Sequence, residues 1–193
     1  MMNRDGSGIR EVSKLYAFAT SWDWKRKGVV YTSAGPDFSS ESTKVDIVSI
    51  NVDDEDLSHN YKTLTKGGAN NAFPSPSPDG KWVVENPGGG SFEMLKIHPN
   101  GTGLQKVIQS GTGGRTNHPW LSPDGKQIVF TSDYAGVSAE PISNPHHYQP
   151  YGEIFVINAD GSGLQRLTHN SFEDGTPTWS PKYIGPPTNA EWP

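Results

Sequence analysis

Short apolar runs rich in β-branched and aromatic residues alternate with turn residues along the whole chain. Residues 127–131 form such a run, typical of a buried strand, and the Ser-Pro-Asp-Gly sequence just before them, at 122–125, predicts a tight turn. Proline sets φ for the first corner, Asp124 tolerates the second, and Gly125 takes the left-handed conformation that returns the chain antiparallel. The pattern therefore predicts a β-hairpin over residues 117–133.

The chain repeats two kinds of hairpin. The Ser-Pro-Asp-Gly-Lys type occurs at residues 77–81 and 122–126. The second type, a strand end, an Asp/Asn-Gly turn and another strand, occurs at residues 3–12, 98–107 and 158–167, and the first and last copies match almost position for position. Because the two types alternate, one repeat comprises four strands.

These repeats predict an all-β protein and, more narrowly, a β-propeller of four-stranded antiparallel blades. Three complete blades are expected at about 14–66, 70–109 and 115–169. A last strand of one blade precedes them, and a first strand of another follows at 175–181. The expected organisation is one propeller segment, residues 1–184, that forms a partial ring, and an irregular tail, residues 185–193.

The repeated motifs resemble the propeller repeat of the TolB family, which is similar to the propeller of dipeptidyl-peptidase-like proteins. The resemblance covers about residues 3–182, and residues 115–182 are particularly similar to the end of plant proteins described as TolB-related. Such relatives are usually six-bladed. The resemblance therefore implies that this chain holds part of a ring.

The second repeat is shorter than the third. The interval from Ser77 to Asn100 is 23 residues, whereas that from Ser122 to Asp160 is 38, and the Phe-x-Ser-Asp expected after Val84 is missing. The pattern indicates that the front of one repeat was joined near residue 85 to the back of a later one, as a natural variant or a gene-model error would do.

Charge and composition exclude several classes of function. The net charge of −5 is spread along the chain without a basic stripe, so nucleic acid is not an expected partner. The absence of cysteine excludes disulfides and thiolate metal sites and fits a reducing compartment. No export signal or membrane span is expected in this chain, while the family resemblance allows an extracellular or cell-wall location.

A proline-rich excursion at residues 134–151 is the first candidate site, because long loops inside compact repeats are often functional. Two histidines and a carboxylate suit zinc, but adjacent histidines on a loop rarely point at one metal. The interpretation is a ligand or partner surface, with a loop packed over the rim as the alternative and no metal or cofactor expected. Its candidate residues are Glu140, His146, His147, Tyr148 and Tyr151.

Polar residues ahead of each first strand's proline are the second candidate site, because in propellers this position faces the central channel. They are Asn70 and Asn71, Asn117 and His118, and Asp174 with Thr176. A ring of such groups suits a small ligand, a peptide or an ion. The favoured interpretation is that they hydrogen-bond buried water.

Three functions remain open. The leading hypothesis is a non-catalytic module that binds a protein or peptide through the channel mouth and the 134–151 loop. The second is a hydrolase-like or lyase-like enzyme with acid–base work on His118, His146, His147 or Glu140; Gly-x-Ser-x-Gly, the nucleophile motif, is absent. The third is a truncated product without activity of its own.

Three structural expectations complete the sequence analysis. Open blade edges predict one of two outcomes, association between copies of the chain or a partly open arc that is mobile at both ends. Trp120 and Trp179, each ahead of a Ser-Pro pair, are expected to fill the space between adjacent blades. The basic run Lys25-Arg26-Lys27 is expected to be a solvated turn tip.

Overall fold

The computed structural model describes residues 1–35, 44–66, 70–87, 93–108, 116–133, 152–170 and 174–180. Within these ranges the chain forms three four-stranded antiparallel sheets and no helix. We call the sheets blades 1, 2 and 3. Blade 1 comprises β1 (Tyr16–Trp22), β2 (Val29–Gly35), β3 (Asp46–Asn51) and β4 (Tyr61–Thr63); blade 2 comprises β5 (Asn71–Pro76), β6 (Val83–Pro87), β7 (Met94–Ile97) and β8 (Gln105–Ile108); blade 3 comprises β9 (Thr116–Leu121), β10 (Gln127–Ser132), β11 (Glu153–Asn158) and β12 (Gln165–Arg166).

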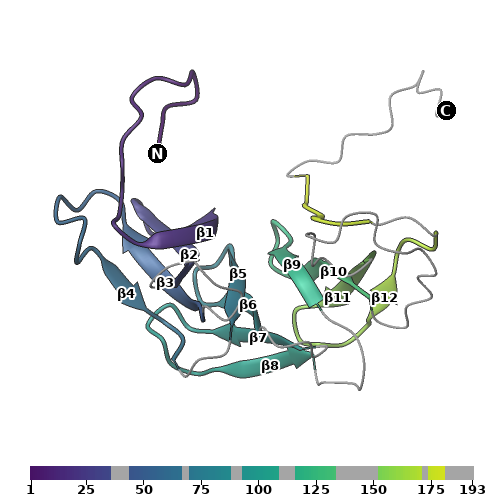
Figure 1. Cartoon of the computed structure of the whole chain (residues 1–193). Helices are drawn as coiled ribbons and strands as arrows, with labels where there is room; N and C mark the ends of the chain where they lie inside the picture. The colour runs from purple at the N-terminus through teal and green to yellow at the C-terminus, as the bar shows by residue number, and fades with distance from the viewer. Residues whose placement is uncertain are drawn as a thin grey trace.

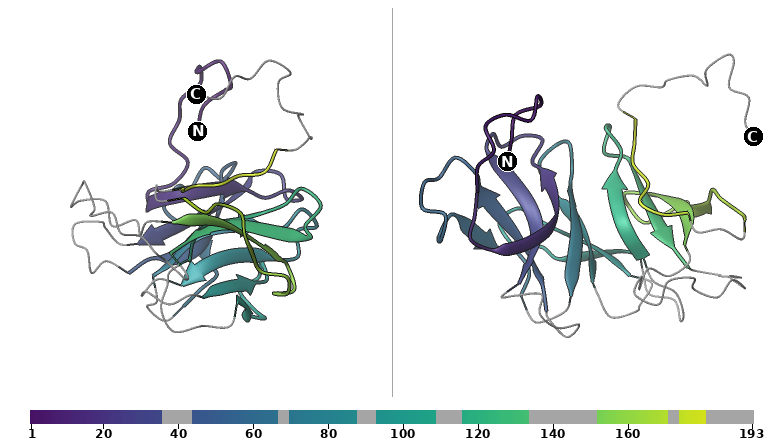
Figure 2. Two further views of the ribbon diagram at one scale, coloured as in Figure 1. Left: turned by 90° about the vertical axis from the view of Figure 1, so that its right-hand side faces the viewer. Right: turned by 45° about the horizontal axis from the view of Figure 1, so that its top comes forward.

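The blades stand side by side in an open arc (Figure 1). Strands follow one another in chain order across each blade, so β1, β5 and β9 form the inner edge of the arc and β4, β8 and β12 its outer edge. Figure 2 shows the same arc from two further sides. The predicted fold class, an all-β propeller in which these blades form part of a ring, is confirmed.

The predicted turns form by the mechanism that their residues indicate. In blade 3 the N–H of Gly125 donates to the carbonyl of Ser122 at 2.8 Å, and the Ser122 hydroxyl donates to Asp124 Oδ1 at 2.6 Å. Gly125 has a φ of 72°, which favours glycine. Blade 2 repeats the turn at residues 77–80, with the corresponding N–H bond at 2.9 Å. Local turn chemistry thus returns the first strands of blades 2 and 3 antiparallel.

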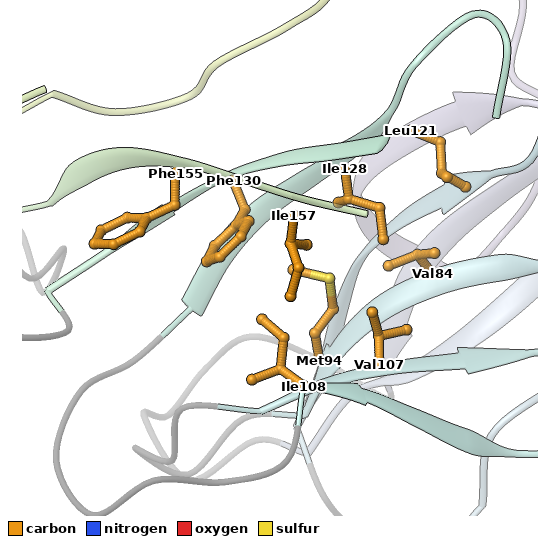
Figure 3. Packing of buried hydrophobic residues seen from close by; sticks show 9 residues of the cluster. All are labelled: Val84, Met94, Val107, Ile108, Leu121, Ile128, Phe130, Phe155 and Ile157. Carbon is orange, nitrogen blue, oxygen red and sulfur yellow. The ribbon is translucent and has the colours of Figure 1, made fainter. Parts of the chain in front are cut away.

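Apolar side chains pack between the blades and hold them at a fixed spacing. The largest cluster joins blades 2 and 3 and is drawn in Figure 3; it contains Val84, Met94, Val107, Ile108, Leu121, Ile128, Phe130, Phe155 and Ile157. A second cluster joins blades 1 and 2 through Tyr31, Ile47, Leu64, Val83 and Ile97. Because each residue contributes on the order of 1.5–3 kcal/mol when buried, these interfaces dominate the stability of the arc.

Part of the N-terminal segment packs on the face of blade 1 that points away from blade 2. Val12 and Leu15 pack on an apolar cluster of that face, and Asn60 Nδ2 donates to the Val12 carbonyl at 2.7 Å. By the repeat, Val12 corresponds to Leu64, which directly follows β4 of blade 1, and to Val107 in β8 of blade 2. Residues 9–12 therefore lie where the fourth strand of a preceding blade would lie.

The shortened second repeat still closes into a complete sheet, but it places a carboxyl in the core. Glu85 pairs with Leu95 as Phe130 pairs with Phe155, so Glu85 occupies the position of a buried phenylalanine. Its side chain is 0% exposed, and neither oxygen makes a hydrogen bond to any described residue. Burial, with a smaller contribution from the charge of Asp46, raises the pKa of Glu85 to about 8. The second repeat thus has a buried carboxyl at a position where the third repeat has a buried phenylalanine.

Trp120 and Trp179 occupy neighbouring positions of the repeat, not matching ones. Pro119 and Pro177 correspond, so Trp179 matches Leu121, while Trp120 matches Ser75. Adjacent positions of a strand point to opposite faces. Trp179 Nε1 donates to the Trp120 carbonyl at 2.8 Å, and both side chains are half-buried rather than fully buried.

Replacing Trp179 with alanine should lower the free energy of unfolding by roughly 2–3 kcal/mol, less than for a fully enclosed tryptophan because part of the ring is in water. Trp24→Ala is the control, since Trp24 is 57% exposed, and should change stability by less than about 0.5 kcal/mol. Urea denaturation measures both. Equal small losses would contradict the packing of Trp179 on blade 3.

The run Lys25-Arg26-Lys27 was expected to be a solvated turn tip, but Arg26 also contacts blade 2. Arg26 Nη1 donates to Asp23 Oδ2 at 2.8 Å and Nη2 donates to the Gly80 carbonyl at 3.2 Å. Tyr31 also donates to Asp23 Oδ2, at 2.7 Å. Charge alone suggested solvation, but the planar guanidinium reaches its own turn and blade 2 at once.

Candidate functional site

Each first strand carries a β-bulge at the same place. The register shifts between Phe18 and Ser21 in β1, between Ala72 and Ser75 in β5, and opposite Val129 and Thr131 in β9. A bulge inserts one extra residue and turns its side chain away from the regular pleat. Three blades therefore present an irregular backbone at the inner edge of the arc.

A residue with positive φ lies in each of these bulges, and a fourth lies in the stretch after blade 3. They are Ala19 at 54°, Phe73 at 57°, His118 at 51° and Thr176 at 49°. None is glycine, so each holds a conformation that costs on the order of 1–3 kcal/mol. Strain repeated at one position of four repeats, on one edge, is typical of a functional surface.

The bulges enclose a concave site of about 380 Å³, which we call the inner hollow. Its floor is aromatic: the rings of Phe18 and Phe73 meet edge to face at 5.8 Å, and the Phe73 ring lies 4.1 Å from that of His118. The lining comprises Phe18, Ala19, Thr20, Ser21, Phe73, Pro74, His118, Pro119, Trp120 and Thr176. An apolar hollow with few polar groups suits recognition of a ligand.

His118 is the titratable residue of this lining. Burial lowers its pKa, because removal from water disfavours the charged imidazolium and favours the neutral ring. Its Nδ1 is buried and makes no hydrogen bond within the described part of the chain. The described residues of the lining contribute no carboxylate that would orient or charge the ring.

Of the sequence candidates, His118 and Thr176 line the inner hollow. The others are absent from its described lining or lie outside the described residues. Asn71 is buried and donates to Asp46 Oδ1 at 3.1 Å, Asn117 pairs with Thr131, and Asp174 Oδ2 accepts from Asn170 at 2.7 Å. Asn70 is exposed. The loop candidates Glu140, His146, His147, Tyr148 and Tyr151 all lie outside the described residues.

Sequence reasoning selected polar residues and missed the aromatic ones. Phe73 precedes Pro74 as His118 precedes Pro119, so alignment of the repeats on these prolines would have identified it in place of Asn71. Phe18 and Ala19 precede no proline, which removed the signal in blade 1. Positive φ at residues other than glycine has no sequence signature.

The described residues contain no group of three or more histidine, cysteine, aspartate or glutamate side chains that could hold a metal ion. They also contain no helix that is long and apolar enough to cross a membrane.

No family model matches the chain. Among curated proteins, an uncharacterized protein of Agrobacterium fabrum is 28% identical over 162 residues, which cover 82% of this chain and 50% of that protein. The Tol-Pal system protein TolB of Geobacter sulfurreducens is 29% identical over 95 residues, 49% of this chain and 18% of that protein. The chain thus spans about half the length of the first relative and matches 18% of the second.

Solved structures show the same fold at lower identity. The putative TolB from Agrobacterium tumefaciens has a TM-score of 0.59 at 21% identity, covering 82% of this chain and 50% of that one. TolB from Acinetobacter baumannii also has a TM-score of 0.59 at 21% identity, over 89% and 37% of the two chains. A puromycin-hydrolyzing peptidase of Mycobacterium tuberculosis scores 0.59 at 16% identity, over 81% and 24%.

TolB proteins are thus among both the relatives and the structural neighbours of this chain, and its three sheets have the β-propeller fold of the TolB structures, a fold also found in a peptidase. The predicted resemblance is confirmed. Because the same fold carries different activities, function has to be argued from the site.

Proposed function

We propose that this chain is a non-catalytic binding module that takes a segment of a protein or peptide partner in the inner hollow. The observation that carries the proposal is the convergence of three bulged first strands and Thr176 on one aromatic, strained concave site. Strain of this kind persists only where the surrounding structure enforces it, and it holds the lining in a preformed shape.

The chemistry of the hollow favours binding over catalysis. Among the described lining residues, His118 is the titratable group, and it lacks a carboxylate neighbour to orient it. General acid–base catalysis requires a group in hydrogen-bond reach of its proton donor or acceptor, normally oriented by a second group. Aromatic rings on a rigid sheet are instead the residues that dominate protein and peptide recognition. The TolB-like fold supports a protein partner as well.

The test is selection of peptides on the immobilised chain from a random phage library, with affinities measured by isothermal titration calorimetry. Phe73→Ala should weaken a selected peptide by about tenfold or more, since a buried aromatic anchor is worth roughly 2 kcal/mol or more. Phe155→Leu, a core change far from the hollow, is the control for general loss of stability. Selected peptides whose affinity is unchanged by Phe73→Ala and His118→Ala would contradict the proposal.

The enzyme hypothesis predicts a different outcome for the same kind of substitution. An enzyme should lose turnover when His118 or His147 becomes alanine, whereas a binding module loses partner affinity and has no turnover to lose. The 134–151 loop stays part of the proposed partner surface, and alanine at His146, His147 or Tyr148 tests it in the same calorimetric assay.

A further inference from the structure

The turn at the N-terminus is fully built although it belongs to no blade. We call residues Asn3–Gly8 the docking turn. Its Asn3 Nδ2 donates to the Ser7 hydroxyl at 3.1 Å, and that hydroxyl donates to Asp5 Oδ1 at 2.7 Å. In blade 3 the turn Asn158–Gly163 makes the same two bonds at 3.0 and 2.7 Å. The two turns are therefore copies in structure as well as in sequence.

The copies in blades 2 and 3 each sit against the preceding blade. A Cβ added to Gly101 would lie 3.1 Å from the carbonyl oxygen of Leu64 in blade 1, and one added to Gly161 would lie 2.2 Å from that of Val107 in blade 2. Leu64 and Val107 are corresponding residues at the fourth strand, only 3% and 5% exposed. Glycine at this place lets the turn lie against the backbone of the neighbouring blade.

Both halves of this contact recur at the two ends of the arc, where no described residue of this chain serves as the partner. In the docking turn, Gly6 has the same left-handed φ, but a Cβ there would meet nothing within 4 Å. At the far end of the arc, Leu167 corresponds to Leu64 and Val107. The Leu167 N–H donates to the Ile154 carbonyl, just as the Leu64 N–H donates to the Ile47 carbonyl. Leu167 is nevertheless 49% exposed. We call this place the docking edge.

We propose that the docking turn of one copy sits on the docking edge of a second copy, so that the chain associates head to tail. The partner is a second copy because this chain carries both complementary surfaces in a geometry that it uses twice internally. Such a heterologous contact closes into a ring or extends into a filament. The inference is independent of the inner hollow and goes beyond the proposed function.

A second exposed surface would be covered by the same contact. Trp22 in β1 corresponds in the repeat to Leu121 in β9, which packs between blades 2 and 3. The Trp22 side chain is 55% exposed on the face of blade 1 that points away from blade 2. Ile9, just after the docking turn, is also exposed. A following copy brings its own Ile9 and Trp22 toward the stretch 174–180 of the first copy, so apolar area adds to the turn contact.

Sedimentation velocity of the 193-residue chain over a range of concentrations tests the inference. The wild type should associate, and Leu167→Lys should raise the dissociation constant by at least about tenfold. Gly6→Ala should do the same, because its methyl group meets the Leu167 carbonyl as a methyl group at Gly161 would meet that of Val107. Leu164→Lys is the control: Leu164 lies in the same hairpin and corresponds to Leu104, which stays exposed inside the arc.

Cross-linking separates association from closure of one chain on itself. The chain lacks cysteine, so single cysteines report directly. A mixture of Arg4→Cys and His169→Cys chains should give heterodimers with a short bis-maleimide, while Lys126→Cys mixed with His169→Cys should not. A wild type that is monomeric at every concentration, association unchanged by Leu167→Lys and Gly6→Ala, or cross-links only within a doubly substituted chain would each overturn the proposal.

Discussion

The free energy of unfolding should fall by roughly 5 kcal/mol as the pH rises from well below 4.5 to well above 8, because of Glu85 alone. The folded chain holds a proton on this carboxyl up to its raised pKa of about 8, whereas the unfolded chain releases it near the ordinary value of 4.5. Between these values the folded state binds more protons, so stability decreases with pH. The loss is complete above pH 8, where folding buries a bare carboxylate beside Asp46.

Glu85→Gln should remove this dependence. The amide keeps the size of the side chain but cannot ionise, so the variant and the wild type should have similar stability near pH 4.5 and differ by several kcal/mol at pH 9. Urea denaturation at pH 5, 7 and 9 measures the difference, and Glu11→Gln, an exposed carboxyl, is the control that should keep the wild-type slope. Parallel pH profiles for wild type and Glu85→Gln would show that Glu85 is solvated.

The second large effect is expected at Gly161. Its alanine variant would place a methyl carbon 2.2 Å from the Val107 carbonyl oxygen, against backbone that cannot move without opening the interface of blades 2 and 3. The left-handed φ of 90° adds about 1–2 kcal/mol of strain. Together these should lower the free energy of unfolding by more than about 3 kcal/mol.

Gly6→Ala is a matched control for this prediction. Gly6 has a φ of 85° in the same turn, with open space where Gly161 has a carbonyl. Thermal denaturation at concentrations where both variants are monomeric therefore separates strain from contact. Gly6→Ala should cost about 1 kcal/mol or less. Equal losses at the two glycines would show that backbone strain alone explains the effect and that the turn does not touch blade 2.

The fold could be predicted because its determinants are local and repeated. Ser122-Pro123-Asp124-Gly125 specifies a turn by its own hydrogen bonds, and the matching turn at residues 77–80 fixes the strand order of a second blade. The strands between the turns are β-branched and aromatic and are buried as predicted. Two local signals in alternation are sufficient to predict four-stranded blades.

The site was harder to predict from the sequence than the fold, because it depends on strand register and on contacts between blades. One extra residue in each bulge brings Phe73 and His118 to the same edge, and the bulge leaves no mark in sequence at Phe73 or Ala19. Arg26 is part of a basic run in sequence, but its position in space makes it a bridge to Gly80. Glu85 was recognised as an irregularity of the repeat; its burial follows only from its pairing with Leu95.

The most direct test of the account is hydrogen-exchange mass spectrometry of the chain with and without a peptide selected on it. If the inner hollow is the binding site, added protection should concentrate in the first strands, at residues 17–21, 72–76 and 117–121. The outer strands β4, β8 and β12 should exchange as in the free chain. Protection confined to the outer strands, with the first strands unchanged, would contradict the central claim.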